Sequence, residues 1–405
     1  MKIVCCPDSF KESMTAARAA AALAAGARRA IPGAQCVEVP MADGGEGFAR
    51  AIADALGARV TTLPVAGVRG ATVTAELALA GERAIFESAA AVGLDQLRPE
   101  DRDIRRSDST GVGQLIARAL DEGATEILVG LGGSATNDGG AGMLAALGAR
   151  FYDDAATELG TTPAEMVRLA RADFSGLDPR LAGVTIRVAC DVDNPLLGER
   201  GASAIYGPQK GASPADVEFL DGVLRNFATV AGKTDVQETP GAGAAGGLGF
   251  AFLLLGASLE SGVDLVMETV GLAEAMVGAD LVLTGEGAMD RQTLMGKTLS
   301  GVARLAAAAG AGVRAGAGAG RDAGAGGAKS VGGTGAGGKS SGVPIIAFAG
   351  KLGEGVEDLY EHGFVGLVPI VDRPCTLDEA LAEGAANLEN AAERALRLYA
   401  AGQRA

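Results

Sequence analysis

A short apolar run followed by a glycine- and acid-rich turn, and then by a helical stretch, recurs along this chain and constrains its fold more than any other feature. The first two runs are "MKIVCC" (1–6) and "QCVEVP" (35–40), and a helical stretch follows each turn. The order strand, helix, strand, helix is typical of a parallel sheet with helices packed on its faces. The same order returns after Gly271 with "DLVLTGEG" (280–287) and "VPIIAFAG" (343–350). The sequence therefore predicts an α/β protein with a doubly wound parallel sheet.

The middle of the chain follows another pattern. Residues 71–88 ("ATVTAELALAGERAIFES") alternate between apolar and polar residues on both sides of an Ala-Gly-Glu turn, which predicts an antiparallel hairpin. We therefore expect one doubly wound domain built from residues 1–56 and 276–405, with a second α/β domain of residues 57–275 inserted in it. The active site is expected in the cleft between the two domains, at the carboxyl ends of strands.

Residues 310–342 consist mostly of glycine, alanine and small polar residues, and they cannot bury enough apolar surface to form a folded structure. We expect a disordered surface insertion. The segment contains a formal match to the P-loop pattern G-x-x-x-x-G-K-S, from Gly333 to Ser340. No predicted strand precedes this match and no predicted helix follows it, so we do not expect it to bind a nucleotide.

The bulk composition excludes several functions. The 405 residues have a formal net charge of −15, which argues against nucleic acid or an anionic membrane surface as a partner. The longest apolar run, residues 250–255, is too short to span a bilayer. The five cysteines form no C-x-x-C pair, so we expect neither a disulfide framework nor a zinc site, and a cytoplasmic location. The single histidine, His362, leaves carboxylates and lysines as the candidate acids and bases of an enzyme.

The segment "LGGSATNDGGAGMLAALG" (131–148) lies between an apolar run and a helical stretch. A glycine-rich turn at such a place presents backbone N–H groups that can hold a phosphate. Its start fits the dinucleotide pattern G-x-G-x-x-A, resembles the phosphate loop of small-molecule GHMP kinases, and also fits a tight turn without a ligand. Four polar residues of the loop favour ligand binding: Ser134, Thr136, Asn137 and Asp138.

A second glycine-rich stretch, "GAGAAG" (241–246), fits the dinucleotide pattern G-x-G-x-x-G. It follows a polar segment rather than a strand, so the pattern lacks the context that a dinucleotide site requires. We interpret it as the start of a helix with free backbone amides.

Five further turns combine an acid or amide with glycine or lysine. Turns at the carboxyl ends of neighbouring parallel strands converge, so their side chains are expected in one cleft. Carboxylates, lysines and amides without a histidine suit Mg²⁺-assisted phosphoryl transfer: the metal takes hard oxygen ligands, lysines and amides hold phosphate oxygens, and an aspartate accepts the proton of the attacking hydroxyl. The chemistry-bearing residues of these turns are Asp8, Ser9, Lys11, Asp43, Glu46, Asp191, Asp193, Asn194, Gln209, Lys210, Glu286, Asp290, Gln292, Lys297 and Thr298.

Six segments together resemble the type I glycerate kinase family of bacteria, in order and along nearly the whole chain apart from residues 310–342. The segments are "PDSFKES", "PMADGGEG", "GLGGSATNDGGAGMLAALGA", "CDVDNPLLGERGASAIYGPQKGA", "GAGAAGGLGFA" and "TGEGAMDRQTLMGKTLSGVA". The resemblance implies ATP- and Mg²⁺-dependent phosphorylation of D-glycerate, at the 2-hydroxyl or, as the alternative, at the 3-hydroxyl. It also implies a flavodoxin-like α/β domain and a second α/β domain.

We assign roles at these motif positions from the chemistry of the side chains. Asp191 is the expected general base, with Asp43 as the alternative, and Lys11 holds the substrate carboxylate or the transferring phosphoryl group. The expected Mg²⁺ ligands are Asp43 and Asp290. The expected nucleotide-binding residues are Gly132, Gly133, Ser134, Thr136, Asn137 and Lys297, and the expected substrate-binding residues are Asp8, Ser9, Lys210 and Asn194.

The chain departs from the family pattern at a few positions. Glu12 and Met14 stand where Gly and Leu are usual, which we interpret as a conservative change at a helix start, and Ala288 stands where a basic residue is common. The change at 288 keeps a non-catalytic sugar-acid binding protein open as an alternative. The alternative of an NAD-dependent dehydrogenase is supported by the G-x-G-x-x-A match alone, and the sequence has no suitably placed acid to bind the ribose. Assembly of the chain into a homo-oligomer is a further alternative.

Overall fold

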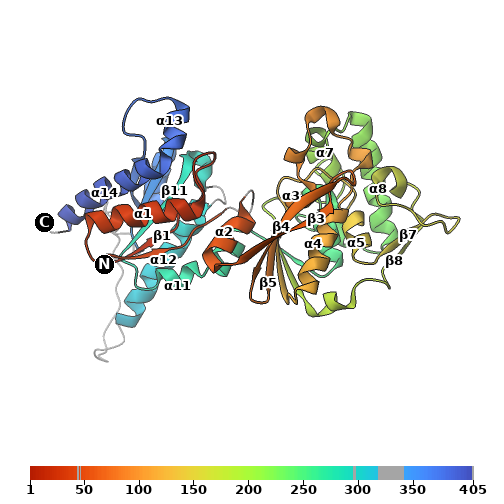
Figure 1. Ribbon diagram of the computed structural model, residues 1–405, viewed down its shortest axis with the longest axis horizontal. Coiled ribbons are helices and arrows are strands. Elements are labelled where there is room, and N and C mark those ends of the chain that lie inside the picture. The colour runs from red at the N-terminus through yellow and green to blue at the C-terminus, as the bar shows by residue number, and fades with distance from the viewer. Residues whose placement is uncertain (43–44, 46, 295–297, 318–341, 404–405) are drawn as a thin grey trace, which may run out of the picture. The chain divides into compact units, whose positions relative to one another are not determined.

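The computed structural model describes residues 1–42, 45, 47–294, 298–317 and 342–403 of the chain. The chain divides into two compact units (Figure 1). One unit, called here the discontinuous unit, consists of Met1–Met41 and Met267–Ala405, and the other, the inserted unit, consists of Ala42–Val266. Helix α10 (Gly262–Thr269) crosses the second boundary between them.

The discontinuous unit contains a parallel sheet in the order β13-β12-β11-β1-β2. Its strands are β1 (Lys2–Cys5), β2 (Gln35–Glu38), β11 (Leu281–Met289), β12 (Ile345–Leu352) and β13 (Phe364–Pro369). Its helices are α1 (Ala16–Ala30), α11 (Leu272–Met276), α12 (Thr298–Ala317), α13 (Leu377–Ala382) and α14 (Gly384–Gly402).

Helices α1 and α14 lie side by side and cover one face of this sheet (Figure 1). Since alternate strand residues point to opposite faces, Ile3 and Leu281 pack with these helices, whereas Val4 is buried outside that cluster. Helix α1 begins after Thr15, whose hydroxyl accepts a hydrogen bond from the backbone N–H of Arg18 at 3.3 Å. Such a cap satisfies one of the backbone donors that a helix start exposes.

The two helices approach closely at Gly26, which permits a prediction. A Cβ atom there would lie 2.3 Å from the carbonyl oxygen of Glu389 and 2.8 Å from Cβ of Ala392. We expect Gly26→Ala to lower the free energy of unfolding by about 1–3 kcal/mol, the cost of overpacking a close contact. Urea unfolding measures this, and Gly222→Ala on helix α8 (Pro214–Val230) is the control because nothing lies within 4 Å of a Cβ there. The control should gain up to about 1 kcal/mol from helix propensity, and a loss of equal size at both sites would contradict the argument.

The inserted unit contains a mixed sheet in the order β10-β9-β6-β5-β4-β3. Strands β5 (Arg83–Glu87), β6 (Glu126–Gly130), β9 (Thr185–Ala189) and β10 (Ser258–Glu260) are parallel, and β3 (Arg59–Ala66) and β4 (Thr72–Ala80) continue the sheet in antiparallel pairs. The antiparallel hairpin that we predicted within residues 71–88 is confirmed as β4 and β5, with Ala80 opposite Arg83.

Helices cover this sheet, and a small ribbon extends from it. The helices are α2 (Phe48–Leu56), α3 (Ala89–Val92), α4 (Thr110–Asp121), α5 (Ala141–Ala146), α6 (Pro163–Met166), α7 (Ala202–Tyr206), α8 (Pro214–Val230) and α9 (Ala244–Leu254), and the 3-10 turns used below are η1 (Leu94–Gln96), η4 (Pro179–Gly183) and η5 (Pro208–Lys210). The two-stranded ribbon is β7 (Arg150–Tyr152) with β8 (Arg171–Asp173). The core includes edge-to-face contacts of Phe227 with Phe151 and Phe250, with ring centroids 5.5 and 5.8 Å apart.

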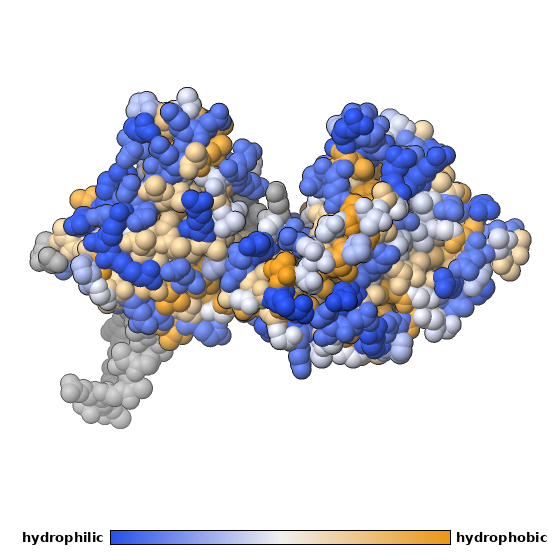
Figure 2. All heavy atoms as spheres, viewed as in Figure 1, coloured by the Kyte–Doolittle hydropathy of each residue, from blue (hydrophilic) through white to orange (hydrophobic). Residues whose placement is uncertain are grey.

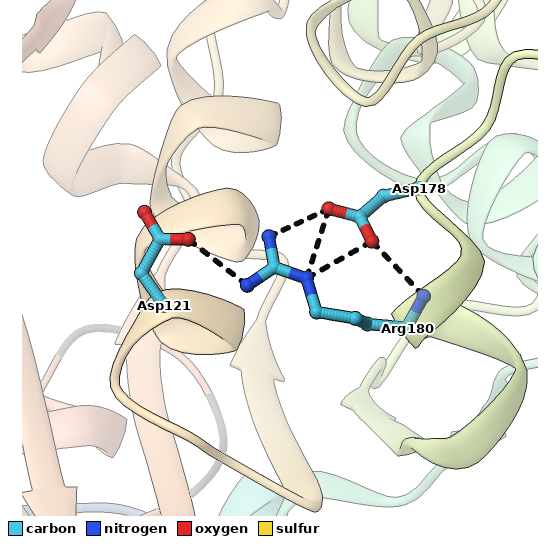
Figure 3. A network of polar contacts seen from close by, with 3 residues as sticks. All are labelled: Asp121, Asp178 and Arg180. Carbon is cyan, nitrogen blue, oxygen red and sulfur yellow. Dashed lines mark hydrogen bonds and ion pairs between the residues drawn. The ribbon is translucent and has the colours of Figure 1, made fainter.

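A network around Arg180 fastens the segment after β8 to helix α4 (Figure 3). Asp178 caps the 3-10 turn η4 by accepting a hydrogen bond from the backbone N–H of Arg180 at 2.9 Å, and its carboxylate also binds the Arg180 guanidinium. The guanidinium reaches Asp121 at the end of α4 as well, at 3.0 Å. Hydrogen bonds from Arg180 hold the pKa of the Asp178 carboxyl below its usual value.

Helix α2 shows where the predicted domain boundary differs from the division of the structure. We expected residues up to 56 in the domain built from both chain ends, but α2 packs against β4, β5 and β6 and belongs to the inserted unit, which begins at Ala42. Its apolar side chains Phe48 and Ile52 are fully buried, and Phe48 lies 3.1 Å from where a Cβ of Gly130 would be. The strand-helix rhythm does not reveal which sheet a helix covers. The other boundary lies at 266 rather than 275.

Helix α12 continues to Ala317 and so enters the segment 310–342, for which we expected no folded structure. That expectation is wrong for residues 310–317. Extending an existing helix by a residue costs far less than nucleating one, and alanine favours extension. The rest of the segment up to 341, with the formal P-loop match from Gly333 to Ser340, lies outside the described residues.

The face shown in Figure 2 carries hydrophilic residues on both units, with apolar residues interspersed among them. In the described part of the chain, no helix combines the length and the apolar character needed to cross a bilayer.

Candidate functional site

The glycine-rich loop between β6 and α5 is folded around the side chain of Asp138. Its carboxylate accepts hydrogen bonds from the backbone N–H and the hydroxyl of Ser109, at 2.9 and 2.7 Å. It also accepts from the backbone N–H groups of Gly140 and Gly142, at 3.1 and 3.0 Å. Asp138 is buried, and burial raises the pKa of its carboxyl group. Asp138 therefore stabilises the loop from inside rather than facing a ligand.

The exposed part of the same loop consists of two glycines, which present only backbone atoms to solvent. Gly132 and Gly133 are exposed, and Gly133 has φ +71°, a conformation that favours glycine. Two backbone hydrogen bonds of 2.8 Å tie the loop to the segment around α3, from Leu94 N–H to the Gly133 carbonyl and from Ala135 N–H to the Val92 carbonyl. The loop thus presents two side-chain-free residues in a fixed position.

Lys210, at the end of η5, reaches this loop from a distant part of the chain. It is only 3% exposed, and its Nζ donates to the carbonyl oxygen of Thr136 at 2.8 Å and to the hydroxyl of Ser134 at 3.1 Å. Burial lowers the pKa of Lys210 to about 7, although the nearby Asp138 charge opposes the shift. A buried amine with so low a pKa is typical of functional sites.

A small cavity of about 200 Å³ lies beside this lysine, within the inserted unit. Its lining includes residues that the sequence analysis singled out: Gly132, Gly133, Ser134, Asp191, Gln209 and Lys210. They come from the loop after β6, the turn after β9 and the 3-10 turn η5. The cavity is below the roughly 300–1,000 Å³ of pockets for drug-sized ligands, so it suits a molecule of few heavy atoms.

Asp191 follows strand β9, and its exposed side chain lines the small cavity. Its Oδ1 accepts a hydrogen bond from the backbone N–H of Gly262 at 2.8 Å, at the start of helix α10. This contact orients the carboxylate. Asp193, two residues further, is 82% exposed in its side chain and pairs with Arg200 at 3.3 Å.

Three predicted ligand-binding residues are buried behind the cavity. Thr136, Asn137 and Asn194 are at most 5% exposed and are not among the described residues that line it. The Asn137 amide nitrogen donates to the Ser203 hydroxyl at 3.0 Å. The Thr136 hydroxyl, the Asn137 amide oxygen and both Asn194 amide atoms are buried without a hydrogen-bond partner within the described residues. Buried polar atoms are normally paired with protein groups or with ordered water, so these four atoms have hydrogen-bonding capacity that the described residues do not use.

The stretch 241–247 supports the loop by close backbone packing. A Cβ on Gly246 would lie 1.9 Å from the carbonyl oxygen of Thr136, and one on Gly243 would lie 2.3 Å from the side-chain nitrogen of Asn194. The backbone N–H of Gly139 donates to the Gly246 carbonyl at 3.0 Å. Ala245 has φ +51° and lines the small cavity. The glycines that we interpreted as a helix start with free amides are needed for this approach.

A second group of predicted residues lies in the discontinuous unit, after β1 and at the end of β11. Asp8 Oδ2 accepts from the Thr298 hydroxyl at 2.6 Å, and its Oδ1 accepts from the backbone N–H of Ser9 at 2.6 Å. The Thr293 hydroxyl donates to Glu286 at 2.8 Å and accepts from the backbone N–H of Asp290 at 3.1 Å. Strands β1 and β11 are parallel neighbours, so both turns lie at the same edge of the sheet.

Lys11 and Glu12 lie in a turn closed by the backbone pair Phe10 and Met14. Lys11 is exposed, and Glu12 has φ +63°. Our interpretation of Glu12 as a conservative change at a helix start is therefore wrong: helix α1 begins only at Ala16, and the left-handed conformation at 12 costs a residue other than glycine about 1–2 kcal/mol.

The remaining predicted residues are placed as follows. Ala288, where the family often has a basic residue, is paired with Lys351 on β12, so a basic side chain is present on the neighbouring strand. The positions Asp43, Gly44, Glu46 and Lys297 lie outside the described residues. Asp8 and Asp290 belong to one unit, and Asp191 and Lys210 to the other. That both groups form one cleft stays a prediction.

Comparison with known proteins supports the reading of these motifs. The model of the glycerate kinase family matches residues 3–336 and 320–400. A protein named glycerate kinase from Halalkalibacterium halodurans is 45% identical over 397 residues, 96% of each chain. A protein named glycerate 2-kinase from Escherichia coli K12 is 41% identical over 410 residues, 100% of this chain and 99% of the relative.

A solved structure agrees with these relatives. It is described as a "putative glycerate kinase 2" from Salmonella typhimurium LT2, and it is 38% identical, covers 100% of this chain and 99% of its own, and superposes with a TM-score of 0.84. The agreement extends over both units and both groups of turns. This chain therefore belongs to the glycerate kinase family.

Proposed function

We propose that this member of the glycerate kinase family transfers the γ-phosphoryl group of ATP to the 2-hydroxyl of D-glycerate. The observation that carries the proposal is the buried ammonium group of Lys210 beside a small cavity that Asp191 also lines. D-Glycerate offers a carboxylate to the lysine and a hydroxyl to the aspartate. The name of the Escherichia coli relative, glycerate 2-kinase, supports the 2-hydroxyl, and the 3-hydroxyl is the alternative.

Lys210 is proposed to bind the substrate carboxylate. An ammonium group has three donors. Two of them are engaged by Ser134 and Thr136, which hold the amine at the cavity wall. A carboxylate that accepts from the third would form a charge-assisted hydrogen bond, about twice as strong as a neutral one.

Asp191 is proposed as the general base. Its carboxylate is oriented by the Gly262 backbone N–H and lines the same cavity as Lys210. A base must lie within hydrogen-bond reach of the hydroxyl from which it takes the proton. Asp43 stays the alternative base.

The glycine-rich loop is proposed to hold the ATP phosphates. The exposed backbone of Gly132 and Gly133 and the hydroxyl of Ser134 are the contacts that its geometry favours. Thr136 and Asn137 would act from behind the loop, and Asn194 from behind the cavity, since their side chains are buried.

The residues of the discontinuous unit complete the proposal. Lys11 is exposed and carries the charge to hold a substrate carboxylate or a transferring phosphoryl group. Asp8 and Ser9 are proposed substrate-binding residues in the adjacent turn, joined by a hydrogen bond. Lys297 is proposed to contact the nucleotide.

Mg²⁺ fits the donor set of the proposed site. In kinases this ion is held by one or two carboxylates together with substrate phosphates, at hard oxygen atoms. Asp290 is exposed, and Thr293 connects its turn to Glu286; Asp290 and Asp43 are the proposed ligands. Within the described residues no three acidic, histidine or cysteine side chains form a group that could hold a metal ion. When bound with ATP, the ion neutralises developing phosphate charge.

Three coarser features belong to the same proposal. The strand order of the discontinuous unit, written in chain order as 2-1-3-4-5, supports a flavodoxin-like domain that carries the inserted unit. The five cysteines are free thiols, which supports a reducing, cytoplasmic location. A homo-oligomer stays open.

Phosphorus NMR of the product tests the proposal. We expect ADP release that depends on D-glycerate and a single phosphorus signal coupled to the proton on C2. A signal coupled to the two protons on C3 would establish 3-hydroxyl transfer instead. Absence of glycerate-dependent ADP release would leave the non-catalytic binding protein as the alternative.

A further inference from the structure

The inserted unit contains a second, larger cavity, which also reaches Gly132 and Gly133 of the glycine-rich loop. Its volume is about 810 Å³, against about 200 Å³ for the small cavity. It is bounded by the start of α2, strand β4, the end of β5 and the α3–η1 segment. Pockets of roughly 300–1,000 Å³ are the usual size for ligands as large as a nucleotide.

The two cavities share a wall made of Leu94, Gly132 and Gly133, which line both. The Leu94 N–H donates to the Gly133 carbonyl at 2.8 Å, so the wall is held by a backbone hydrogen bond. Two of its three residues have no side chain. A ligand in the large cavity and a ligand in the small one would therefore meet over exposed backbone, the arrangement that a direct phosphoryl transfer requires.

The chemistry of the large cavity suits a nucleoside. Ala89, Ala90 and Leu97 supply an apolar wall, and Glu76 supplies an acceptor for hydroxyl groups. The Gln96 side chain is oriented because its amide nitrogen donates to the Ala89 carbonyl at 2.8 Å. Its amide oxygen is thus available as an acceptor that a purine amino group can use.

Arg102 is the cation positioned for phosphate. It lines the large cavity. One of its guanidinium nitrogens donates to the backbone carbonyl of Gln209 at 2.8 Å. Gln209 in turn lines the small cavity. Its Nε is buried and has no hydrogen-bond partner within the described residues. The other arginine of the cavity, Arg50, is paired with Asp54 at 2.9 Å.

We propose that the large cavity is the nucleotide site, with the nucleoside against α3 and η1, the phosphates directed to Gly132 and Gly133, and Arg102 as a phosphate-binding residue. This inference rests on the proposed function, because it assigns glycerate to the small cavity and the nucleotide to the large one. The acids Glu87 and Asp95 also line the large cavity. The Glu87 carboxylate accepts a hydrogen bond from the Ala49 N–H at 3.1 Å, which ties it to the start of α2.

A matched pair on β4 tests the location. Thr74 and Thr72 are both exposed and point to the same face of the strand, but only Thr74 is among the residues that line the cavity. We expect Thr74→Trp to raise the Kd of MgADP, measured by calorimetry, by about tenfold or more, since an indole would fill space needed by the nucleoside. Thr72→Trp should stay within about twofold. Equal Kd values for both variants and the wild-type protein would overturn the proposal.

A second comparison tests the phosphate contact. Arg102→Ala is expected to raise the Kd of MgADP by about tenfold or more and to leave the Kd of adenosine within about twofold, because adenosine has no phosphate. Arg102→Lys should recover part of the affinity for MgADP, since it restores the charge without the planar fork. Equal weakening of adenosine and MgADP would assign Arg102 a structural role and overturn this contact.

A variant of the small cavity separates the two sites. Val192, which is 37% exposed, lines only the small cavity of the two. Val192→Phe is expected to raise the KM for glycerate by about tenfold while the Kd of MgADP stays within about twofold. Loss of MgADP affinity in Val192→Phe, with normal affinity in Thr74→Trp, would place the nucleotide in the small cavity. MgADP binding is measured without glycerate, so its result tests the nucleotide site independently of the proposed phosphorylation reaction.

Discussion

Lys210→Met is expected to lower kcat/KM for glycerate by about three orders of magnitude, or about 4 kcal/mol, which lies within the cost of removing one partner from a buried charge pair. The ammonium group is buried and lies at the wall of the small cavity, so water cannot replace it as the partner of a carboxylate. Methionine has a similar length and fills the same space without the charge. The MgADP Kd should be little changed, since the proposed nucleotide site lies across the shared wall.

The pH dependence of the wild-type protein should show the same lysine. Because burial lowers its pKa to about 7, Lys210 loses its proton as pH rises above 7, and the KM for glycerate should rise by up to about tenfold per pH unit there. Lys210→Met should abolish this rise. The free energy of unfolding should increase over the pH range in which glycerate binding weakens. In the unfolded chain the pKa is near 10.5, so the unfolded state binds more protons between pH 7 and 10.5, and stability should increase with pH across that window.

Lys233→Met is the control for both measurements, because Lys233 is an exposed lysine of the same unit. It should retain the wild-type kcat/KM and the wild-type pH profile. A Lys210→Met enzyme with wild-type KM, or a profile that keeps its rise above pH 7, would remove Lys210 from the substrate site.

Asp191→Asn is the second change with a large expected effect. We expect kcat to fall by about 10²- to 10⁴-fold, the usual contribution of a general base, because an amide of the same shape cannot accept the hydroxyl proton. The Asn side-chain oxygen can still accept the hydrogen bond of the Gly262 N–H, so the turn should keep its structure. Steady-state kinetics measures kcat, and calorimetry with MgADP should give a Kd near that of the wild-type protein.

Asp193→Asn is the matched control, two residues along the same turn. Its carboxylate is largely exposed and pairs with Arg200 rather than facing the cavity. Its kcat should stay within about twofold of the wild-type value, since exposed ion pairs contribute little. If Asp191→Asn also kept that rate, Asp191 would not be the base, and Asp43→Asn would be the next variant to measure.

Local sequence signals predicted the elements well where each element is recognisable from its own residues. The hairpin of β4 and β5 followed from alternation about Gly81. The glycine-rich loop followed from its place between an apolar run and a helix. Each of these depends on interactions among residues a few positions apart, which a sequence displays directly.

The predictions were wrong or silent where the answer depends on distant partners. Helix α2 was assigned to the wrong unit because its apolar face does not say which sheet buries it. Asp138 was expected to help the loop bind a ligand, but its carboxylate accepts four hydrogen bonds from within the protein. Arg102 belongs to no motif, and its relation to Gln209 depends on a contact across more than a hundred residues.

The sequence by itself determined the family, the strand-helix order and the chemical types of the candidate groups. Motifs and short-range periodicity depend only on residues that are close together in the chain. Only the tertiary structure decided which of those groups are buried, which line a cavity and which support the loop from behind. The burial of Lys210 is the clearest case: its lowered pKa comes from desolvation by residues that are far from it in the chain. Burial and the resulting loss of hydration are properties of packing, and the packing exists only once the distant segments have come together.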